Sequence, residues 1–471
     1  MDKQRPYVDS KCVPNESVSM FRHPLALHCQ HYSPPPSILP LPMKRHFGLS
    51  IVFATVFFAS SWTFAGDADW PQWRGPSRDG HAAPQSLLQQ WSPGGPATKW
   101  EFRGAGIGYS TFAIVDDRLY TMGSKGHDCL TICVDTKTGG LIWETITSRS
   151  AVETDYSHGW GGGPRSTPTV DGEFVYSLSD VGVLACLQIA DGKIVWSVDF
   201  VNQFGGSIPK WGFSESVLVD GDRVIGTPGG EAFMIGLDKR TGAKVWTTPK
   251  VEAAQYVSIV KHSIGGEAFY VTASKKGLVG VNAASGELLF QDNATGNEIA
   301  VIPTPILSGD LLYHTSAYDA GNTLLRLTKG QGSAITAESI YHLSSKSMQN
   351  HHGGVVLVDG VIYGFTKSNN GTWMAQDLAS GDTLWTEKLM PNRSGSIAYA
   401  DGRLYCYNDA DGTVILVEPS RSGWKKCGEL KLPEQTKIER EKGAIWAHPI
   451  IAGQTLYLRD QDLIFAFDIA R

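Results

Sequence analysis

The sequence predicts an all-β fold, an eight-bladed β-propeller closed by an N-terminal strand that completes the last blade. Two different motifs recur along the chain at intervals of about 46 to 48 residues, and the two ends of the repeat array each supply part of one unit. The composition agrees, since 52 of 471 residues are Gly and 42% are hydrophobic. Such a chain has many tight turns and enough apolar side chains for a large core.

The first motif is a turn pair followed by a short apolar strand, as in Asp171-Gly172 leading to Tyr176. Its spacing suits four short antiparallel strands joined by hairpins. No stretch between the copies has the amphipathic period of a substantial helix. The eight copies lead to Tyr120, Tyr176, Ile225, Tyr270, Tyr313, Tyr363, Tyr405 and Tyr457.

The second motif places a polar residue four positions before a turn glycine and an aromatic residue four positions after it. Asp135, Gly139 and Trp143 form an intact copy. A short polar residue and Gly make a tight turn, and the aromatic ring then starts the next strand. Because burying each ring removes about 150–250 Å² from water, we expect the rings to hold neighbouring blades together. The expected docking positions are Trp100, Trp143, Trp196, Trp246, Phe290, Trp385 and Trp424, with Tyr341 as a further candidate.

The two ends of the array predict how the ring closes. After Tyr457 the last repeat offers only the segment 463–468, so it lacks a fourth strand. An unassigned segment around Trp100 matches the outer strand of the other repeats. Pairing the two segments would remove two exposed sheet edges.

The residues before the array have the pattern of export signals. Residues 1–42 are Pro-rich and predict a disordered leader, and Met43 is a candidate for the true start. Residues 43–65 combine basic residues, a short apolar run and small residues, which predicts a signal peptide cleaved near Ala65. Residues 66–97 are expected to form an extended segment before the propeller at 98–471. We therefore expect a periplasmic or secreted protein without a transmembrane span in its mature chain.

Charge and motif content exclude several classes of function. The formal net charge of −6 argues against nucleic acid and anionic membranes as partners. The sequence has no G-x-S-x-G, H-E-x-x-H or P-loop motif. Five cysteines after Ala65, at irregular spacing, predict mostly buried thiols and at most one disulfide. The charged stretch from Trp424 to Lys442 predicts a solvated loop or a short exposed helix.

The intact copies at Asp135–Trp143 and Asp238–Trp246 resemble the tryptophan-docking motif of PQQ-like β-propeller repeats, and the resemblance covers about residues 98–471. It implies an exported eight-bladed propeller of one of two kinds. One is the quinoprotein alcohol dehydrogenases, which bind pyrroloquinoline quinone (PQQ) and Ca²⁺ in the central funnel. The other is non-catalytic scaffolds such as BamB of outer-membrane assembly. The dehydrogenases typically carry two adjacent Cys beside the quinone, and this sequence has no Cys-Cys pair. The opening Asp69–Gly75 also looks like that of exported PQQ-like proteins of unassigned role.

A propeller places a binding site at the funnel mouth, where the loops that enter the innermost strands converge. The Gly-rich stretch 156–165 offers side chains that bond, stack and bind anions, or it is a plain blade connection. The ligand-binding candidates in these loops are His158, Trp160, Arg165, Trp211, Asn350, His351, His352, Arg393 and His448.

Two kinds of cofactor site are compatible with these side chains. The three imidazoles of His351, His352 and His448 suit a transition metal, with Glu215 as a carboxylate ligand, or they are neutral hydrogen-bonding groups. Trp160, Trp211, Glu215 and Asn350 are the residue types that a quinone and its cation would need, although the rings also suit lid packing. Glu215 is the candidate catalytic residue if the protein is an enzyme.

The sequence therefore favours an exported, non-catalytic, monomeric scaffold that binds a protein or peptide partner, with no cofactor expected. The alternative is a PQQ- and Ca²⁺-dependent alcohol dehydrogenase with its site in the funnel. A carbohydrate- or metal-binding sensor is a third hypothesis, in which the ligand is a small molecule.

Overall fold

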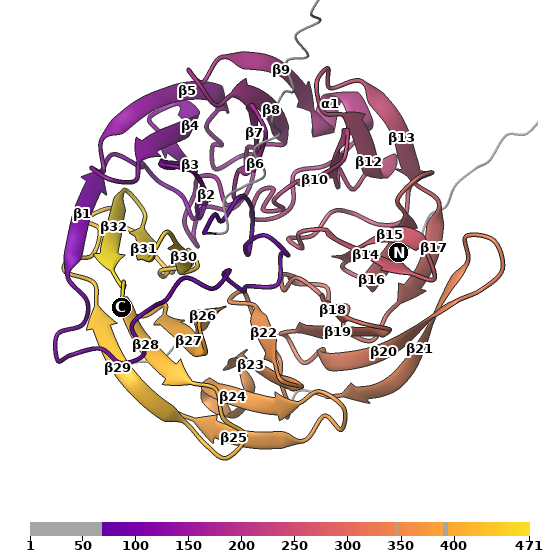
Figure 1. Ribbon diagram of the computed structural model, residues 1–471. Coiled ribbons are helices and arrows are strands. Elements are labelled where there is room, and N and C mark those ends of the chain that lie inside the picture. The colour runs from indigo at the N-terminus through magenta and orange to yellow at the C-terminus, as the bar shows by residue number, and fades with distance from the viewer. Residues whose placement is uncertain (1–67, 345, 390–393) are drawn as a thin grey trace, which may run out of the picture. The chain divides into compact units, whose positions relative to one another are not determined.

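The computed structural model describes residues 68–344, 346–389 and 394–471, which form a ring of eight four-stranded antiparallel sheets (Figure 1). The predicted fold is thus confirmed. The chain divides into Met1–Ser60 and Ser61–Arg471. The expected leader and signal peptide lie outside the described residues.

The blades are numbered in chain order, and each runs from an inner to an outer strand. Blades 1 to 4 contain β2 (Ala113–Val115), β3 (Arg118–Lys125), β4 (Asp128–Asp135) and β5 (Leu141–Arg149); β6 (Thr169–Asp171), β7 (Phe174–Leu178), β8 (Val183–Gln188) and β9 (Ile194–Asp199); β10 (Leu218–Asp220), β11 (Arg223–Gly226), β12 (Ala232–Asp238) and β13 (Lys244–Pro249); and β14 (Val260–Ile264), β15 (Glu267–Ser274), β16 (Gly277–Asn282) and β17 (Leu288–Asp292).

Blades 5 to 8 continue the same order. They contain β18 (Ile306–Ser308), β19 (Leu311–Ser316), β20 (Gly321–Lys329) and β21 (Ile335–Leu343); β22 (Val355–Val358), β23 (Val361–Thr366), β24 (Thr372–Asp377) and β25 (Thr383–Glu387); β26 (Gly395–Ala400), β27 (Arg403–Asn408), β28 (Thr413–Glu418) and β29 (Lys425–Lys431); and β30 (Ile450–Ala452), β31 (Thr455–Asp460) and β32 (Leu463–Asp468), with β1 (Thr98–Arg103). The two helices of the described residues are short, α1 (Phe200–Phe204) and the 3₁₀ turn η1 (Ser368–Asn370). Neither has the length or hydropathy to cross a membrane.

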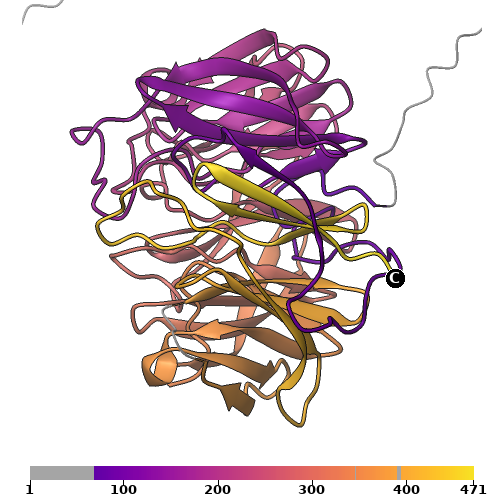
Figure 2. The same ribbon diagram turned by 90° about the vertical axis from the view of Figure 1, so that its left-hand side faces the viewer.

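The ring closes as the sequence predicts, through β1 of the N-terminal part. β1 pairs antiparallel with β32, with Trp100 opposite Ala466 and Arg103 opposite Leu463. Figure 2 shows the indigo strand lying beside the yellow strands of blade 8. Arg459 of β31 is fully buried and donates to the carbonyl oxygens of Ser110 and Met122 in blade 1, at 2.8 and 2.7 Å. Strand pairing and a buried guanidinium together join the last blade to the first.

The docking turn explains why the second motif needs its residue types. The Asp135 carboxylate accepts hydrogen bonds from the Thr138 backbone N–H at 2.7 Å and hydroxyl at 2.8 Å, and Gly139 follows with φ +72°. A Cβ on Gly139 would lie 2.8 Å from the Trp100 ring, so only glycine lets the indole lie against the turn. Trp100 Nε1 donates to Thr136 O at 2.7 Å. The aromatic ring of one blade thus docks on the turn of the next blade.

The same contact recurs around the ring. Glycines at the equivalent turns meet the preceding blade's aromatic ring in four further pairs, Trp143 with Gly192, Trp196 with Gly242, Trp246 with Gly286 and Tyr341 with Gly381. Trp385 donates its Nε1–H to Ser420 O at 2.7 Å. Phe290, which has no donor, packs against Phe269 of its own blade.

Blade 7 differs from the sequence-based expectation at Trp424. The register pairs Gly428 with Leu416, and in blade 1 the corresponding position pairs Trp143 with Cys133. The docking position of blade 7 is therefore a glycine, while Trp424 precedes β29 and packs against Trp385 of blade 6. The charged segment Lys425–Lys431 is strand β29, where a loop or helix was expected.

Trp91, from the segment before β1, fills the space above that glycine. A Cβ on Gly428 would lie 2.5 Å from the Trp91 Cβ, and the Trp91 ring packs edge-on against Tyr405 at 5.8 Å. Tyr120 makes a similar contact with Trp143 in blade 1, at 5.9 Å. Trp91 is 5% exposed. A residue far away in sequence therefore supplies the ring that the seventh repeat lacks.

Residues 70–82 also form the floor of the ring. Trp70 N–H donates to Ile114 O of blade 1, Val170 N–H of blade 2 donates to Pro71 O, and Tyr399 N–H of blade 7 donates to Gly80 O, each at 2.8 Å. We call residues 70–82 the plug, because they cross the centre of the ring (Figure 1). The first part of the expected extended segment thus lies in the propeller's interior, and its later residues contact blade 7 before β1 begins.

Exchanging Trp91 for Ala should cost about 3–5 kcal/mol of unfolding free energy, because it empties a well-packed aromatic site. Trp424→Ala is the matched control, and we expect it to cost about 1 kcal/mol because its ring is half-buried. Urea unfolding followed by far-UV circular dichroism measures both. Equal losses in the two variants would contradict the assignment of Trp91 to the docking position.

Candidate functional site

Two buried arginines hold the plug in place. Arg74 Nη2 donates to Val355 O of blade 6 and to Asp79 O within the plug, the latter at 2.8 Å. Arg78 donates to the carbonyl oxygens of Ser216 and Val217 in blade 3. Burial lowers the pKa of each guanidinium to about 10, so both stay charged at neutral pH. Paired with backbone carbonyl dipoles, these charges fix the plug against both sides of the ring.

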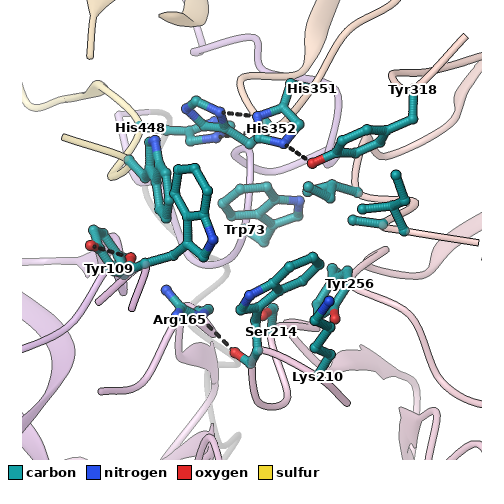
Figure 3. A pocket seen from close by; sticks show the side chains of 16 residues that line it. Trp73, Tyr109, Arg165, Lys210, Ser214, Tyr256, Tyr318, His351, His352 and His448 are labelled. Atoms are coloured by element: carbon teal, nitrogen blue, oxygen red, sulfur yellow. Dashed lines mark hydrogen bonds between the residues drawn. The ribbon is translucent and has the colours of Figure 1, made fainter. Parts of the chain in front are cut away.

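Above the plug lies a cavity of about 400 Å³ at the funnel mouth (Figure 3). Trp73 of the plug lies at its centre and donates its Nε1–H to Thr304 Oγ1 at 2.8 Å. Most other lining residues come from loops that enter the innermost strands, as expected for a propeller. The lining comprises Trp73, Tyr109, Trp160, Arg165, Lys210, Trp211, Ser214, Tyr256, Ile299, Ala300, Ile302, Tyr318, His351, His352, Trp446 and His448.

Six of the ligand-binding candidates from the sequence line this cavity, namely Trp160, Arg165, Trp211, His351, His352 and His448. His158 lies outside the lining and packs on Tyr156 at 4.6 Å. Asn350 is buried, and its side-chain amide donates to the carbonyl oxygens of Gly354 and Phe365. It therefore shapes the loop that carries the two neighbouring histidines. Arg393 lies outside the described residues.

The three histidines form one neutral wall. Tyr318 Oη lies 2.8 Å from His351 Nε2, the Nδ1 atoms of His351 and His352 are 3.3 Å apart, and His448 Nε2 donates to His352 O at 3.0 Å. Burial lowers the pKa of His351 and of His448 to about 3, and it lowers that of His352 as well. The described residues contain no group of three metal-ligating side chains, so the hypothesis of a metal held by these imidazoles and Glu215 has no support in this geometry.

Glu215 does not face the cavity. Its side chain is 2% exposed, and its Oε2 accepts a hydrogen bond from the Thr227 N–H at 2.9 Å. Burial raises its pKa to about 8, against the opposing effect of Thr227 and the Arg78 charge. The candidate catalytic residue of the sequence is thus enclosed beside the plug, out of reach of a ligand in the funnel.

The described lining offers aromatic faces for a quinone but no carboxylate ligands for the calcium ion that accompanies it. Trp160 stacks on Trp446, with ring centres 6.2 Å apart and planes 25° apart, and Trp211 lies 5.8 Å from Tyr256. Such faces suit a planar group. Calcium needs six to eight oxygen ligands, usually with several carboxylates, and the sixteen lining residues include no Asp or Glu. In the part of the chain that the structure describes, the donor set for Ca²⁺ is therefore missing.

Sequence reasoning missed Trp73, Lys210 and Tyr318 as lining residues. Trp73 precedes the repeats, so no repeat position points to it. Lys210 lies one position before the predicted Trp211, and Tyr318 lies in the β19–β20 turn, where no loop entry was expected. The apolar residues Ile299 and Ile302 precede blade 5 and gave no chemical signal.

The ring of docked repeats, closed by its own N-terminal strand, defines an eight-bladed propeller of PQQ-like repeats. A family model described as outer membrane protein assembly factor BamB matches residues 127–387, and the chain belongs to this family. A curated relative, outer membrane protein assembly factor BamB of Burkholderia pseudomallei (strain K96243), is 24% identical over 366 residues, which are 74% of this chain and 81% of the relative.

Solved structures share the fold at low sequence identity. BamB from Moraxella catarrhalis is 15% identical, with a TM-score of 0.55 over 79% of this chain and 100% of its own. A quinohemoprotein alcohol dehydrogenase from Pseudomonas putida HK5 is 13% identical, with a TM-score of 0.61 over 86% of this chain and 80% of its own. At these identities the likeness concerns the fold alone.

The buried histidines should make the protein less stable in acid. An ordinary histidine takes up a proton near pH 6.5 in the unfolded chain, while His448 resists protonation in the folded state down to about pH 3. Unfolding free energy should therefore fall as pH drops below 6.5, by about 1.4 kcal/mol per pH unit for each such histidine. Urea unfolding of His448→Gln between pH 6.5 and 4.5 should show a slope that is shallower by about this amount. His127→Gln, at an exposed turn, is the control that keeps the wild-type slope.

Glu215 should make the protein less stable as the pH rises, which is the opposite of the effect of the histidines. Its folded pKa of about 8 exceeds its ordinary value, so folding favours the protonated form and stability is lost as pH rises from about 4.5 to 8. Between pH 6.5 and 8, Glu215→Gln should lose less stability than the wild type in thermal unfolding. Identical pH profiles of the two proteins would contradict this assignment.

Proposed function

We propose that this protein is an exported, non-catalytic scaffold that binds a protein or peptide partner in its funnel. Membership of the BamB family supports a scaffold, and the relative's name as an outer membrane protein assembly factor supports the periplasm as its location. The ring and its closed floor form a scaffold that positions the converging loops for a partner. The proposal concerns the funnel mouth, where those loops meet.

The observation that carries the proposal is the chemistry of the cavity lining. Aromatic rings, two cations and three uncharged imidazoles suit the binding of a ligand. Oxidation of an alcohol through a quinone and Ca²⁺ would need carboxylates at the site, and Glu215 is enclosed elsewhere. Binding therefore explains the described lining better than catalysis does.

Photo-crosslinking in the source cells tests the scaffold. Benzoylphenylalanine placed at Trp160, which is 43% exposed at the funnel mouth, should give a defined protein adduct that mass spectrometry identifies. The same probe at Leu141 is the control, because this residue is similarly exposed but lies on the outer strand β5. The absence of a funnel-specific adduct in cells that express the protein would contradict the proposal.

The enzyme alternative predicts a different result. A PQQ-dependent enzyme would show quinone absorbance and alcohol-dependent dye reduction after incubation with PQQ and Ca²⁺. We expect the purified protein to show neither after gel filtration, because the described lining offers no carboxylate to calcium. A PQQ-dependent alcohol dehydrogenase treated in parallel is the positive control. Dye reduction by this protein above its apo form would favour the dehydrogenase.

A further inference from the structure

The cavity carries positive charge on one wall only. Arg165 and Lys210, from the entry loops of blades 2 and 3, lie on the opposite side of Trp73 from the three histidines (Figure 3). In the described chain neither forms an ion pair with a carboxylate. Since the histidines are neutral, the two cations determine the charge of the cavity.

The Arg165 side chain is held in place before any ligand arrives. Its Nε donates to Trp211 O at 2.8 Å, its Nη2 donates to Gly161 O at 2.6 Å, and its guanidinium lies 4.8 Å from the centre of the Tyr109 ring. Asp180 lies behind this wall, where its carboxylate accepts a hydrogen bond from Tyr156 at 2.7 Å. Burial raises the pKa of Asp180, and the nearby charge of Arg165 opposes this rise. A fixed guanidinium loses little entropy when it binds an anion.

Lys210 and the buried ring nitrogen of Trp211 add to the polarity of this wall. Lys210 Nζ lies 5.0 Å from the centre of the Trp211 ring, over its face. Trp211 Nε1 on this wall and His352 Nε2 on the opposite wall are buried and have no hydrogen-bond partner among residues 68–344, 346–389 and 394–471. An indole N–H can only donate, so an acceptor group of a ligand would satisfy it. The wall of blades 2 and 3 is thus suited to an oxygen anion.

The rest of the lining suits an aromatic ring. Trp73 forms the floor, with its ring centre 4.6 Å from that of His448, and the stacked pair Trp160 and Trp446 lies beside it. A cavity of about 400 Å³ holds one large side chain together with the side chains next to it in the ligand. The aromatic faces and the cationic wall share this cavity, so the ring and the anion of a ligand must be close together.

The exposed rim indicates that the ligand extends beyond the cavity. Trp160, Ile299 and Tyr318 line the cavity and yet are 43%, 47% and 39% exposed. A small molecule sunk in the funnel would leave these apolar surfaces in water, whereas a chain that leaves the funnel would cover them. The net charge of −6 does not prevent an acidic ligand from binding, because charges beyond about 8 Å are screened at physiological salt.

We propose that the funnel anchors an aromatic side chain flanked by carboxylates, presented by an acidic segment of the partner protein. The ring lies on Trp73 between the rim aromatics, and a carboxylate binds Arg165 and Lys210. This inference rests on the proposed scaffold function and adds the chemistry of its partner. Binding needs no Ca²⁺.

Synthetic peptides test this recognition with the full-length protein. Acetyl-Glu-Glu-Phe-Glu-Glu-amide should bind in calorimetry and quench the tryptophan fluorescence, with the same affinity in EDTA. Peptides with Ala in place of Phe, or Lys in place of Glu, should bind at least tenfold more weakly. If either control peptide binds as well as the first, the proposal is overturned.

Variants of the cationic wall locate the site. Arg165→Gln and Lys210→Gln should each weaken the acidic peptide about tenfold and reduce the salt dependence of its binding, because each removes one charge-assisted contact. Lys244→Gln, on the exposed outer strand β13, should leave binding unchanged. Arg165→Gln removes the hydrogen bonds to Trp211 O and Gly161 O, so it could weaken binding by altering the loop. Lys210 makes no side-chain hydrogen bond in the described chain, so Lys210→Gln tests the charge alone. Undiminished binding by folded Lys210→Gln and Arg165→Gln would refute the anionic subsite.

Two further outcomes separate this inference from the proposed function. Phenylacetate that binds as tightly as the peptide would identify a free aromatic acid as the ligand and would overturn the partner segment. A funnel-specific protein adduct that persists in the double variant Arg165→Gln/Lys210→Gln would leave the scaffold intact and would refute the acidic anchor.

Discussion

Two buried guanidinium groups hold the N-terminal plug in the centre of this propeller. Arg74 and Arg78 bind carbonyl oxygens of blades 6 and 3, and so they stretch the plug across the centre of the ring. A buried charge is costly unless it is hydrogen-bonded, so the plug is stable only in the position where those carbonyls lie. With the plug fixed, the channel becomes a cup with Trp73 as its floor. The cavity at the funnel mouth exists because these two side chains hold its base.

The sequence predicts the parts of this architecture that local rules specify. The turn at Asp135–Gly139 requires its own residues, so its recurrence revealed the number of blades, and the incomplete last repeat revealed how the ring closes. Trp424 was misplaced because a motif count cannot detect a register, and the missing ring comes from Trp91, outside the repeats. The plug was unpredictable for the same reason, because the contacts that hold it to the blades are with residues distant in sequence.

The site was predicted by position more successfully than by chemistry. Loop entries identified Arg165, Trp211 and the three histidines, because propeller geometry brings those loops together. Burial, which the sequence does not show, determines which of these side chains are charged and which can reach a ligand. It leaves the histidines uncharged and encloses Glu215, so the two cations beside Trp211 are the charged groups of the lining.

The closure of blade 8 constrains the order in which the molecule can assemble. β1 is synthesised before every other strand and β32 after every other strand, yet they are neighbours in one sheet. A chain that emerges from its N-terminus therefore carries β1 unpaired until β32 has emerged, however many blades have already formed. Truncation at the C-terminus by a single strand would leave β1 without a partner, so the ring is completed in one late, all-or-none step.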